Sequence, residues 1–324
     1  MTSRPLDRAF ALEAVRVTEA AAIAAAEQIG RGDEHAADHA AVEAMRKAFN
    51  SLPISGTVVI GEGELDEAPM LYIGEKVGSG GIAIDIALDP LEGTTPTAKA
   101  LPNALAVMAM AEPGTLLNAP DTYMDKIAIG GGYPDGIIDL DADPKDNILA
   151  LARAKGVRPR EITACILDRP RHEKLIAAVR EAGAAVRLIT DGDVAGVIAT
   201  SDPATGIDIY IGQGGAPEGV LAAAALRCVG GQIQTRLVFR NDVERERAAK
   251  WGIKDLKKKY SLMDLASGDV VFAATGVTDG SMLEGVHKTG GFITTESVVM
   301  RSATGTVRWI KARHVRSRHL KDGQ

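Results

Sequence analysis

The sequence is poor in the residues that mark several large protein classes. It has only two cysteines, Cys165 and Cys228, which cannot build a disulfide framework, and neither stands in a CxxC pair. We therefore expect two buried thiols in a reducing compartment. No stretch approaches the roughly 20 apolar residues that a transmembrane helix needs. Residues 1–30 carry an acid near their start and polar positions every third or fourth residue, which predicts an amphipathic helix rather than a signal peptide, and thus a cytoplasmic protein.

Aromatic residues and positive charge are also scarce. Aromatic residues form 4 % of the chain and the formal net charge is -6, which argues against general nucleic-acid binding. The basic segments 254–260 and 308–321 lack interleaved aromatic residues, so we expect solvated faces or subunit contacts there. The expected assembly is a homo-oligomer, a dimer or a tetramer, with neither nucleic acid nor a membrane as a partner.

Glycine and alternating apolar segments are abundant, and they predict an α/β protein. With 324 residues, 46 % of them hydrophobic, the chain is long enough for one large domain or two medium ones. The turn-rich segment 130–147 suggests a connection between two lobes, which we place at 1–160 and 161–324. The patterns predict helices at 5–29, 33–52, 171–184 and 218–231, and strands at 56–64, 82–90, 104–112, 158–168, 185–193, 206–215, 269–280 and 291–302.

Acidic residues or glycines come immediately after four of the predicted strands, in VVIGEGE, IALDPLEGT, LITDGD and YIGQGGAPEG. Strand ends are where α/β proteins assemble ligand sites. Glu62 and Glu64 are flanked by glycines, which makes a helix cap a poor explanation for them. Glu218, in APEG, stands between a proline and a glycine, as Glu92 does in DPLEGT. At a helix start, its negative charge would also interact favourably with the helix dipole.

The segment DPLEGT, residues 89–94, concentrates this pattern. Asp89 and Glu92 are three residues apart across a proline that fixes φ, and Gly93 lets the chain approach a ligand closely. Two like charges held this near each other are unfavourable unless a proton or a cation lies between them. All-oxygen ligands indicate a hard divalent cation such as Mg²⁺ or Mn²⁺. The alternative is a capped turn with solvated acids. His35 and His39 have the spacing of zinc ligands, but no third ligand pattern follows, so we interpret them as exposed helix residues.

Longer blocks of the sequence carry a family resemblance. IGEGELDEAPMLYIGEKVG, DPLEGTTPTA, LNAPDTYMDKI, DGDVAG and GGAPEGV resemble the class II fructose-1,6-bisphosphatases, the bacterial type that includes fructose/sedoheptulose bisphosphatases. DPLEGT alone marks the wider superfamily of metal-dependent, lithium-sensitive sugar and inositol phosphatases. The resemblance implies the layered α/β/α/β/α sugar-phosphatase fold of that superfamily, with an N-terminal metal-binding lobe and a C-terminal sugar-phosphate-binding lobe.

The resemblance also implies a set of site residues. One Mg²⁺ or Mn²⁺ ion would be held by Asp38 and Glu62, and a second by Asp89, Glu92 and Glu218. The turn Glu92, Gly93 and Thr94 would contact the phosphate that is cleaved. The sugar and its second phosphate would be bound by Tyr123, Arg169, Pro170, Arg171, Asp191, Gly192, Asp193 and Gly215. Gln213 departs from the apolar residue that relatives tend to have, which bears on substrate specificity and leaves the metal ligands intact.

The chemistry of these residue types agrees with that assignment. Phosphate-monoester hydrolysis is among the slowest uncatalysed reactions, and two metal ions can activate a water and stabilise the leaving oxygen. Thr94 is placed to hydrogen-bond that water, with Asp38, or Glu62 beside it, as the acidic partner; a structural turn hydroxyl is the alternative. Arg169 and Arg171 flank a proline and suit a phosphate dianion, or else form a solvated basic turn. Asp193 could also cap a helix.

The function that the resemblance implies is hydrolysis of the 1-phosphate of fructose 1,6-bisphosphate in gluconeogenesis. Sedoheptulose 1,7-bisphosphate in the Calvin cycle is a further substrate that the family allows. An inositol or other sugar monophosphatase is one alternative, which has no use for arginines that bind a second phosphate. A non-catalytic sugar-phosphate sensor is the alternative from another class, and it need not retain the carboxylates and Thr94.

Overall fold

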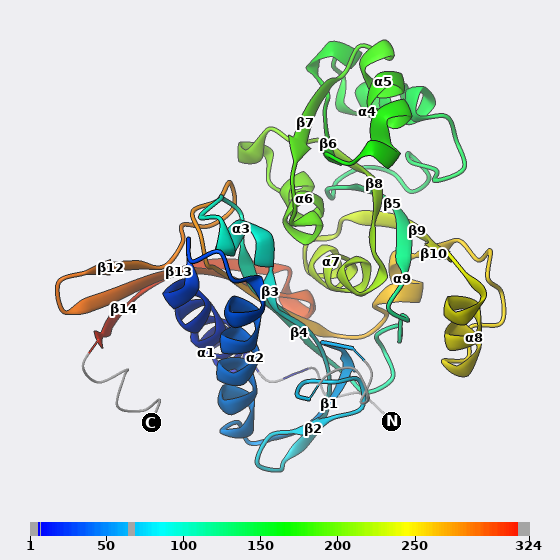
Figure 1. Ribbon diagram of the computed structural model, residues 1–324. Coiled ribbons are helices and arrows are strands. Elements are labelled where there is room, and N and C mark those ends of the chain that lie inside the picture. Colours follow the sequence, from blue (N-terminus) through cyan, green and yellow to red (C-terminus); the bar gives the residue numbers. More distant parts are fainter. Residues whose placement is uncertain (1–5, 7, 64–68, 317–324) are drawn as a thin grey trace. The chain divides into compact units, whose positions relative to one another are not determined.

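The computed structural model describes residues 6, 8–63 and 69–316, and its contacts divide the chain into two compact units (Figure 1). Unit 1 comprises Met1–Pro113 and Asp269–Gln324, and unit 2 comprises Gly114–Gly268. Unit 2 is therefore inserted into unit 1. This division differs from the predicted lobes at 1–160 and 161–324, because the end of the chain returns to pair with strands of the first unit.

Unit 1 is built on a mixed sheet with the strand order β12-β13-β11-β4-β3-β1-β2, in which β14 pairs with the free side of β13. Within this sheet, β1 and β3 are the only parallel neighbours among the described strands. The strands are β1 Ile54–Ile60, β2 Lys76–Val77, β3 Ile82–Glu92, β4 Leu105–Ala111, β11 Val270–Gly276, β12 His287–Thr289, β13 Phe292–Arg301 and β14 Thr306–Val315.

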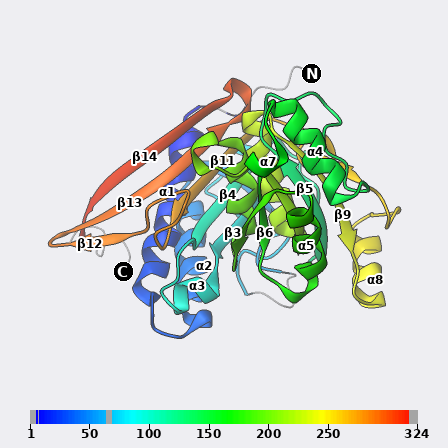
Figure 2. The ribbon, with the colours of Figure 1, turned by 90° about the horizontal axis from the view of Figure 1, so that it is seen from above.

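Two long helices pack on this sheet: α1 Phe10–Ala25, which ends in the 3-10 turn η1 Ala26–Gln28, and α2 Glu34–Asn50. Helix α1 lies along β11 and β13 (Figure 2). Its buried face combines small alanines, such as Ala21 and Ala22, with larger apolar residues, such as Val17. Asp33 caps α2, because its Oδ1 accepts a hydrogen bond of 2.9 Å from the Ala36 amide. The short helix α3 Thr94–Ala98 follows β3, and η6 Ser302–Thr304 joins β13 to β14.

Unit 2 has its own mixed sheet, in the order β10-β9-β5-β8-β6-β7. The strands are β5 Tyr123–Ile129, β6 Thr163–Leu167, β7 Ala185–Ile189, β8 Ile209–Gly215, β9 Gln232–Val238 and β10 Tyr260–Ser261. The helices are α4 Pro144–Lys155, α5 Glu173–Glu181, α6 Asp193–Ile198, α7 Ala216–Val229, α8 Asp242–Lys250 and α9 Leu262–Leu265, with 3-10 turns η2 Pro159–Glu161, η3 Pro170–His172, η4 Ala199–Ser201 and η5 Pro203–Thr205.

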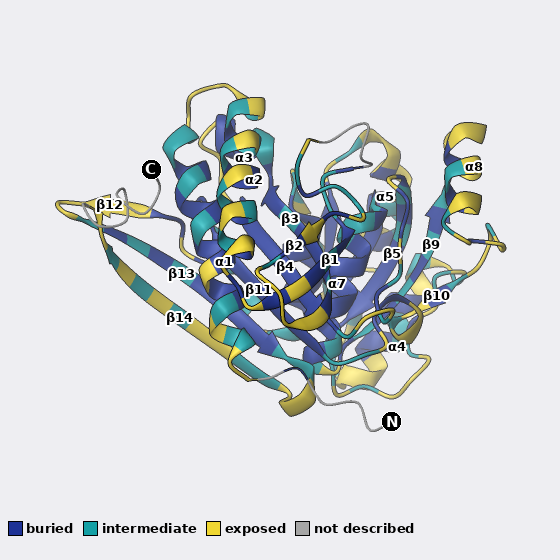
Figure 3. Cartoon of the chain, turned by 90° about the horizontal axis from the view of Figure 1, so that it is seen from below, coloured by how far each residue is buried: buried dark blue, intermediate teal, exposed yellow. Residues whose placement is uncertain are grey.

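The strands of unit 2 present different side chains to two helical layers. Ile127 of β5 packs in one core with residues of α4 and α5. Successive strand residues point to opposite faces, so Lys126 faces the other way, toward α7, where Gly219 lies beside it. Most strand residues are buried, whereas α8 and β14 carry many exposed residues (Figure 3).

Most predicted elements are confirmed, and the architecture is α/β with mixed sheets. The segment 82–90 lies within β3, the segment 104–112 covers β4, and 218–231 matches α7. Cys165 and Cys228 are buried thiols, as predicted. Strands β5, β9 and β14 and helices α4 and α8 were not predicted from the sequence. The turn-rich segment 130–147 lies inside unit 2 and does not connect the units. None of the helices in the described part of the chain is long and apolar enough to span a membrane.

Candidate active site

The DPLEGT segment forms the end of β3 and the start of α3. The pairing of β3 with β4 shifts register between Asp89 and Glu92, and such a bulge redirects side chains at a strand end. Asp89 Oδ1 accepts a hydrogen bond of 3.0 Å from the Leu91 amide. Gly93 then adopts φ +105°, and a Cβ there would lie 3.2 Å from the Ala104 Cα. The turn therefore requires glycine, and it brings two carboxylates and a helix start together.

Three threonines follow this glycine, and they differ in what their hydroxyls bind. The Thr95 hydroxyl donates to Glu34 Oε1 at 2.9 Å, and the Thr97 hydroxyl donates to the Gly93 carbonyl at 2.9 Å. Thr94 is half-buried, and its hydroxyl has no hydrogen-bond partner among the described residues. The bracing of the turn therefore rests on Thr95 and Thr97, and the Thr94 hydroxyl is the one available to a ligand.

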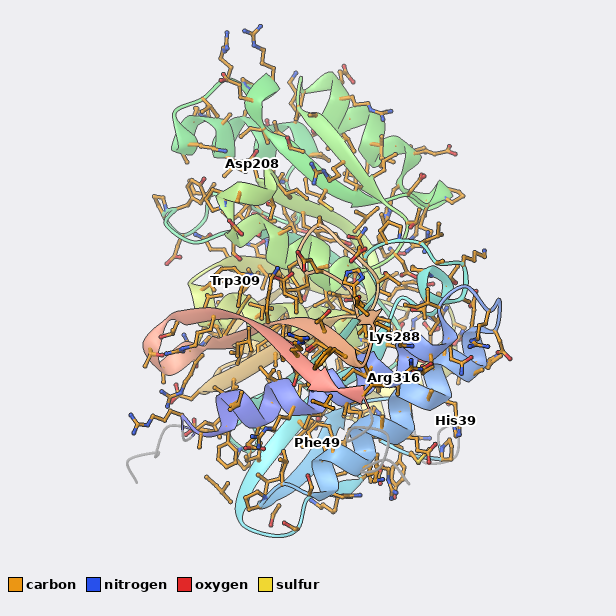
Figure 4. The ribbon with its side chains drawn as sticks, turned by 90° about the vertical axis from the view of Figure 1, so that its left-hand side faces the viewer. His39, Phe49, Asp208, Lys288, Trp309 and Arg316 are labelled. Atoms are coloured by element: carbon orange, nitrogen blue, oxygen red, sulfur yellow. The ribbon has the colours of Figure 1, made fainter. Side chains whose placement is uncertain are left out.

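Asp38 and Glu62 come from two other elements of unit 1. Asp38 lies on α2, which contacts both α3 and β3, and burial raises the pKa of its carboxyl while His35 and His39 oppose that shift. Both histidines are exposed, as predicted, and Figure 4 shows His39 on the outer side of α2. Glu62 follows β1, and its amide donates to the Leu71 carbonyl at 3.1 Å. Glu64, the other acid of this segment, lies outside the described residues.

Glu218 belongs to unit 2, in the first turn of α7. A Cβ on Gly215, the residue before the helix, would lie 1.9 Å from Glu218 Oε2, so a side chain there would displace the Glu218 carboxylate. That Oε2 atom is buried and has no hydrogen-bond partner within the described chain. Burial and the nearby charge of Asp193 raise the pKa of Glu218 to about 7, against the opposing charge of Lys126. A buried, unsatisfied carboxylate oxygen is what a divalent cation would stabilise.

The donor set predicted from the sequence fits a hard metal ion in its chemistry, since every member is a carboxylate. The set is divided between the units: four members lie in unit 1, and Glu218 lies in unit 2. Among the described residues, no group of three or more His, Cys, Asp or Glu side chains is placed to hold a metal. Neither unit by itself therefore presents a complete metal cluster.

A cationic and aromatic cluster lies at one end of the unit 2 sheet. The Arg171 guanidinium lies 5.0 Å from the centroid of the Tyr123 ring, and the Arg240 guanidinium lies 4.8 Å from it. Arg171 also donates to the Gln213 carbonyl at 2.8 Å. Arg169 is directed elsewhere, to the carbonyl of its neighbour Asp168 at 3.2 Å. The structure thus brings Tyr123 and Arg171 together and adds Arg240, for which the sequence carried no signal.

The arginine cluster is anchored through His172 and Gln213. His172 Nδ1 lies 2.7 Å from the Leu167 carbonyl, and its Nε2 accepts a 2.9 Å hydrogen bond from the Gln213 amide. Burial lowers the pKa of His172, which agrees with a neutral ring that donates from Nδ1 and accepts at Nε2. The Gln213 side chain donates to Asp125 Oδ1 at 2.9 Å. The polar residue at this position therefore has a defined partner, and it lines a cavity of about 320 Å³ beside Arg171.

The DGD segment joins β7 to α6 through Gly192, at φ +81°. Asp193 is the first residue of α6 and does not cap it with its side chain, so the alternative of a helix cap is wrong. The Asp193 carboxylate instead forms an ion pair of 2.5 Å with Lys126 of β5. Lys126 was missed because a single lysine in an apolar strand pattern gives no sign of the distant acid that pairs with it.

Comparison with known proteins agrees with these features. Residues 8–314 match the model of a family described as bacterial fructose-1,6-bisphosphatase, glpX-encoded. The chain is 46 % identical over 321 residues to fructose-1,6-bisphosphatase 1 class 2 of Escherichia coli K12, with 95 % of each chain covered. The same identity and coverage relate it to the fructose-1,6-bisphosphatase class 2 of Shigella flexneri.

Proposed function

The chain belongs to the family of bacterial, glpX-encoded fructose-1,6-bisphosphatases, and on this premise we propose that it hydrolyses the 1-phosphate of fructose 1,6-bisphosphate to fructose 6-phosphate and phosphate in gluconeogenesis. The observation that carries the proposal is the match over nearly the whole chain, which includes DPLEGT and the DGD and GGAPEG segments. A monophosphatase of the wider superfamily is not favoured, because the family model is that of a bisphosphatase and because an arginine cluster suits a second phosphate.

The carboxylates would hold the metal ions on which the family's chemistry depends. We assign one Mg²⁺ or Mn²⁺ to Asp38 and Glu62, and a second to Asp89, Glu92 and Glu218. When bound, such ions neutralise the phosphate charge, lower the pKa of water and stabilise the leaving oxygen. The buried Oε2 of Glu218 and the all-carboxylate donor set support this assignment.

The cationic cluster of unit 2 would bind the phosphate that is retained. Arg171 and Arg240 offer guanidinium forks that match phosphate oxygens, and Tyr123 between them offers a phenol hydroxyl. Asp191 and Asp193 would accept hydrogen bonds from sugar hydroxyls. Gly192 and Gly215 let the backbone approach the sugar, and Arg169 with Pro170 completes the loop that presents Arg171.

Thr94 and Asp38 would act on the proton of the attacking water. The Thr94 hydroxyl lies at the start of α3, where it could hydrogen-bond the water, and it has no partner among the described residues. Asp38, with Glu62 beside it in the donor set, would receive the proton. Gly93 and the following amides of α3 would face the cleaved phosphate.

Several finer features belong to the same proposal. The α/β/α/β/α layering of the lithium-sensitive superfamily is supported by DPLEGT at the end of β3. A cytoplasmic location is supported by the substrate class. A homo-oligomer and activity on sedoheptulose 1,7-bisphosphate follow from the family resemblance alone.

A phosphate-release assay with fructose 1,6-bisphosphate tests the proposal. We expect turnover with Mg²⁺ or Mn²⁺, loss of turnover in EDTA, and recovery when the metal is restored. Full activity in chelator contradicts the metal assignment. Inactivity on the bisphosphate with turnover of inositol monophosphate supports the rival enzyme, and binding without turnover of either supports the sensor.

A further inference from the structure

Unit 2 holds a lysine that is buried at the middle of its sheet. Lys126 belongs to β5, which lies between β8 and β9, and only 1 % of the residue is exposed. Its ammonium group pairs at 2.5 Å with Oδ2 of Asp193, which is 5 % exposed. A lysine is almost never fully buried without a specific partner, because removing its charge from water is costly.

The surrounding residues leave a slot for this pair. A Cβ on Gly214 would lie 1.9 Å from Asp193 Oδ2 and 3.2 Å from Lys126 Nζ. A Cβ on Gly219 would lie 2.6 Å from the Met124 sulfur and 3.3 Å from Lys126 Cε. Gly214 and Gly219 flank the segment 215–218 in the chain. The space that holds the Lys126 side chain therefore adjoins Glu218.

The two oxygens of Asp193 are used differently. Lys126 and, at 3.5 Å, the Tyr210 hydroxyl both reach Oδ2. Oδ1 accepts no hydrogen bond from the residues that the structure describes. The ion pair thus fixes the carboxylate through one oxygen and leaves the other as an acceptor for a ligand.

Stability alone is a poor reason for such a pair. Replacing a buried ion pair by apolar residues of similar volume is often neutral or stabilising, whereas removing one partner leaves an uncompensated charge. Nearby Cys165, Val194 and Ala195 are buried and apolar. Packing at this place therefore does not by itself require an ion pair.

We propose that Lys126 is a positioning residue of the active site, which orients the Asp193 carboxylate so that its Oδ1 accepts a hydrogen bond from a sugar hydroxyl. The inference rests on the proposed function, because it takes Asp193 as a sugar-binding residue. Lys126 does not touch the substrate in this arrangement and acts on the sugar through Asp193. Its removal should therefore change KM for the bisphosphate more than kcat.

A double-mutant cycle on the full-length, metal-loaded enzyme tests this coupling. We expect Lys126→Met and Asp193→Asn each to raise KM at least about tenfold, the effect of losing a hydrogen bond to a charged group, with kcat changed much less. The double variant should have a KM no higher than the worse single variant. Its melting temperature should exceed that of Lys126→Met, because no unpaired charge remains.

Lys155 and Asp208 supply the matched control, since they form another lysine–aspartate pair within unit 2, and Figure 4 labels Asp208. Lys155→Met, Asp208→Asn and their double variant should leave KM at the wild-type value. Should Lys126→Met be too unstable at the assay temperature, all three variants are assayed below its melting temperature. Raised and equal KM values in Lys126→Met, Asp193→Asn and the double variant support the coupling.

Two outcomes overturn the inference. A double variant with wild-type KM would mean that the pair is only structural, and KM effects that add would mean that Lys126 acts independently of Asp193. Both differ from a failure of the proposed function, in which the wild-type enzyme itself does not hydrolyse fructose 1,6-bisphosphate.

Discussion

At the scale of the residue, neighbouring side chains of the same type differ in the partners that they have within the fold. Thr95 and Thr97 are bound to Glu34 and to the backbone, whereas the Thr94 hydroxyl is left to a ligand. In the same way, Arg169 turns back to its own loop while Arg171 lies over Tyr123. Because of these contacts, the expected roles of Thr94 and Arg171 can each be tested against a neighbouring residue of the same type.

Thr94→Ala should lower kcat by about 10²–10⁴-fold, the range usual for a positioned proton-transfer group, with little change in KM or metal affinity. Thr94→Ser should keep much of the rate because it keeps the hydroxyl. Thr95→Ala is the matched control: it should cost stability through the lost bond to Glu34 and leave kcat nearly unchanged. Steady-state kinetics across a Mn²⁺ titration measure both effects. Rescue of Thr94→Ala to the wild-type rate by metal alone would remove Thr94 from the catalytic residues.

Arg171→Ala should raise KM for the bisphosphate much more than it lowers kcat, because a remote phosphate is bound alike in the ground and transition states. Arg240→Ala should act in the same direction, since Arg240 faces the same ring. Arg245→Ala provides the control, because Arg245 is exposed and pairs only with Asp242 among the described residues. An unchanged KM in both Arg171→Ala and Arg240→Ala would mean that the cluster is a surface feature.

At the scale of the element, the site depends on how β3 ends. The strand pairs regularly with β4 up to Asp89, shifts register, and passes through Gly93 into α3. The bulge and the left-handed glycine together turn a buried strand into a helix start within a few residues. A left-handed glycine also precedes α6 in unit 2, at Gly192, whereas Gly215 before α7 is extended, with φ -64°.

Gly93→Ala should destabilise the protein and lower its activity. The alanine would be strained at φ +105°, by about 1–3 kcal/mol, and its Cβ would press on Ala104. Gly80→Ala is the control with nearly the same backbone strain, since Gly80 has φ +100° and open space around a Cβ. Denaturant unfolding of both variants separates strain from contact. Equal losses of stability would show that the close approach to Ala104 does not matter.

At the scale of the whole molecule, unit 2 is a continuous insertion in unit 1, and the proposed residues divide accordingly. Asp38, Glu62, Asp89, Glu92 and Thr94 belong to unit 1, and the proposed sugar-binding residues belong to unit 2. Glu218 is the one proposed metal ligand that unit 2 supplies. A metal site that draws on both units would make metal binding a property of the entire chain.

Asp89→Asn and Glu218→Gln, one from each unit, should both abolish activity and remove most of the rise in melting temperature that Mn²⁺ gives the wild-type protein. A ligand that binds only the native state stabilises it, and each variant loses a carboxylate of the same ion. Glu13→Gln in unit 1 and Asp242→Asn in unit 2, each a member of a local ion pair and neither a proposed ligand, should keep the full shift. Retention of the shift in Glu218→Gln would show that unit 2 contributes no ligand.

Local patterns were sufficient for most of the elements and for the family. The Asp33 cap, the apolar strand 82–90 and the glycines after it depend on residues a few positions apart, where spacing in the sequence is spacing in the structure. The family resemblance rested on such short blocks, and the family match confirms it. Strand β5 was missed because YMDKIAI carries Asp125 and Lys126 in its middle, which weakens the apolar pattern.

The sequence by itself thus determined the α/β class, most of the strands and helices, the family and its chemistry. Only the tertiary structure decided the unit boundaries, because β11 hydrogen-bonds to β4 across an insertion that no local pattern marks. It also decided that Arg240 joins Arg171 at Tyr123 and that Lys126 pairs with Asp193. These contacts join residues far apart in the chain, and their partners are selected by strand register and helix packing rather than by neighbouring residues.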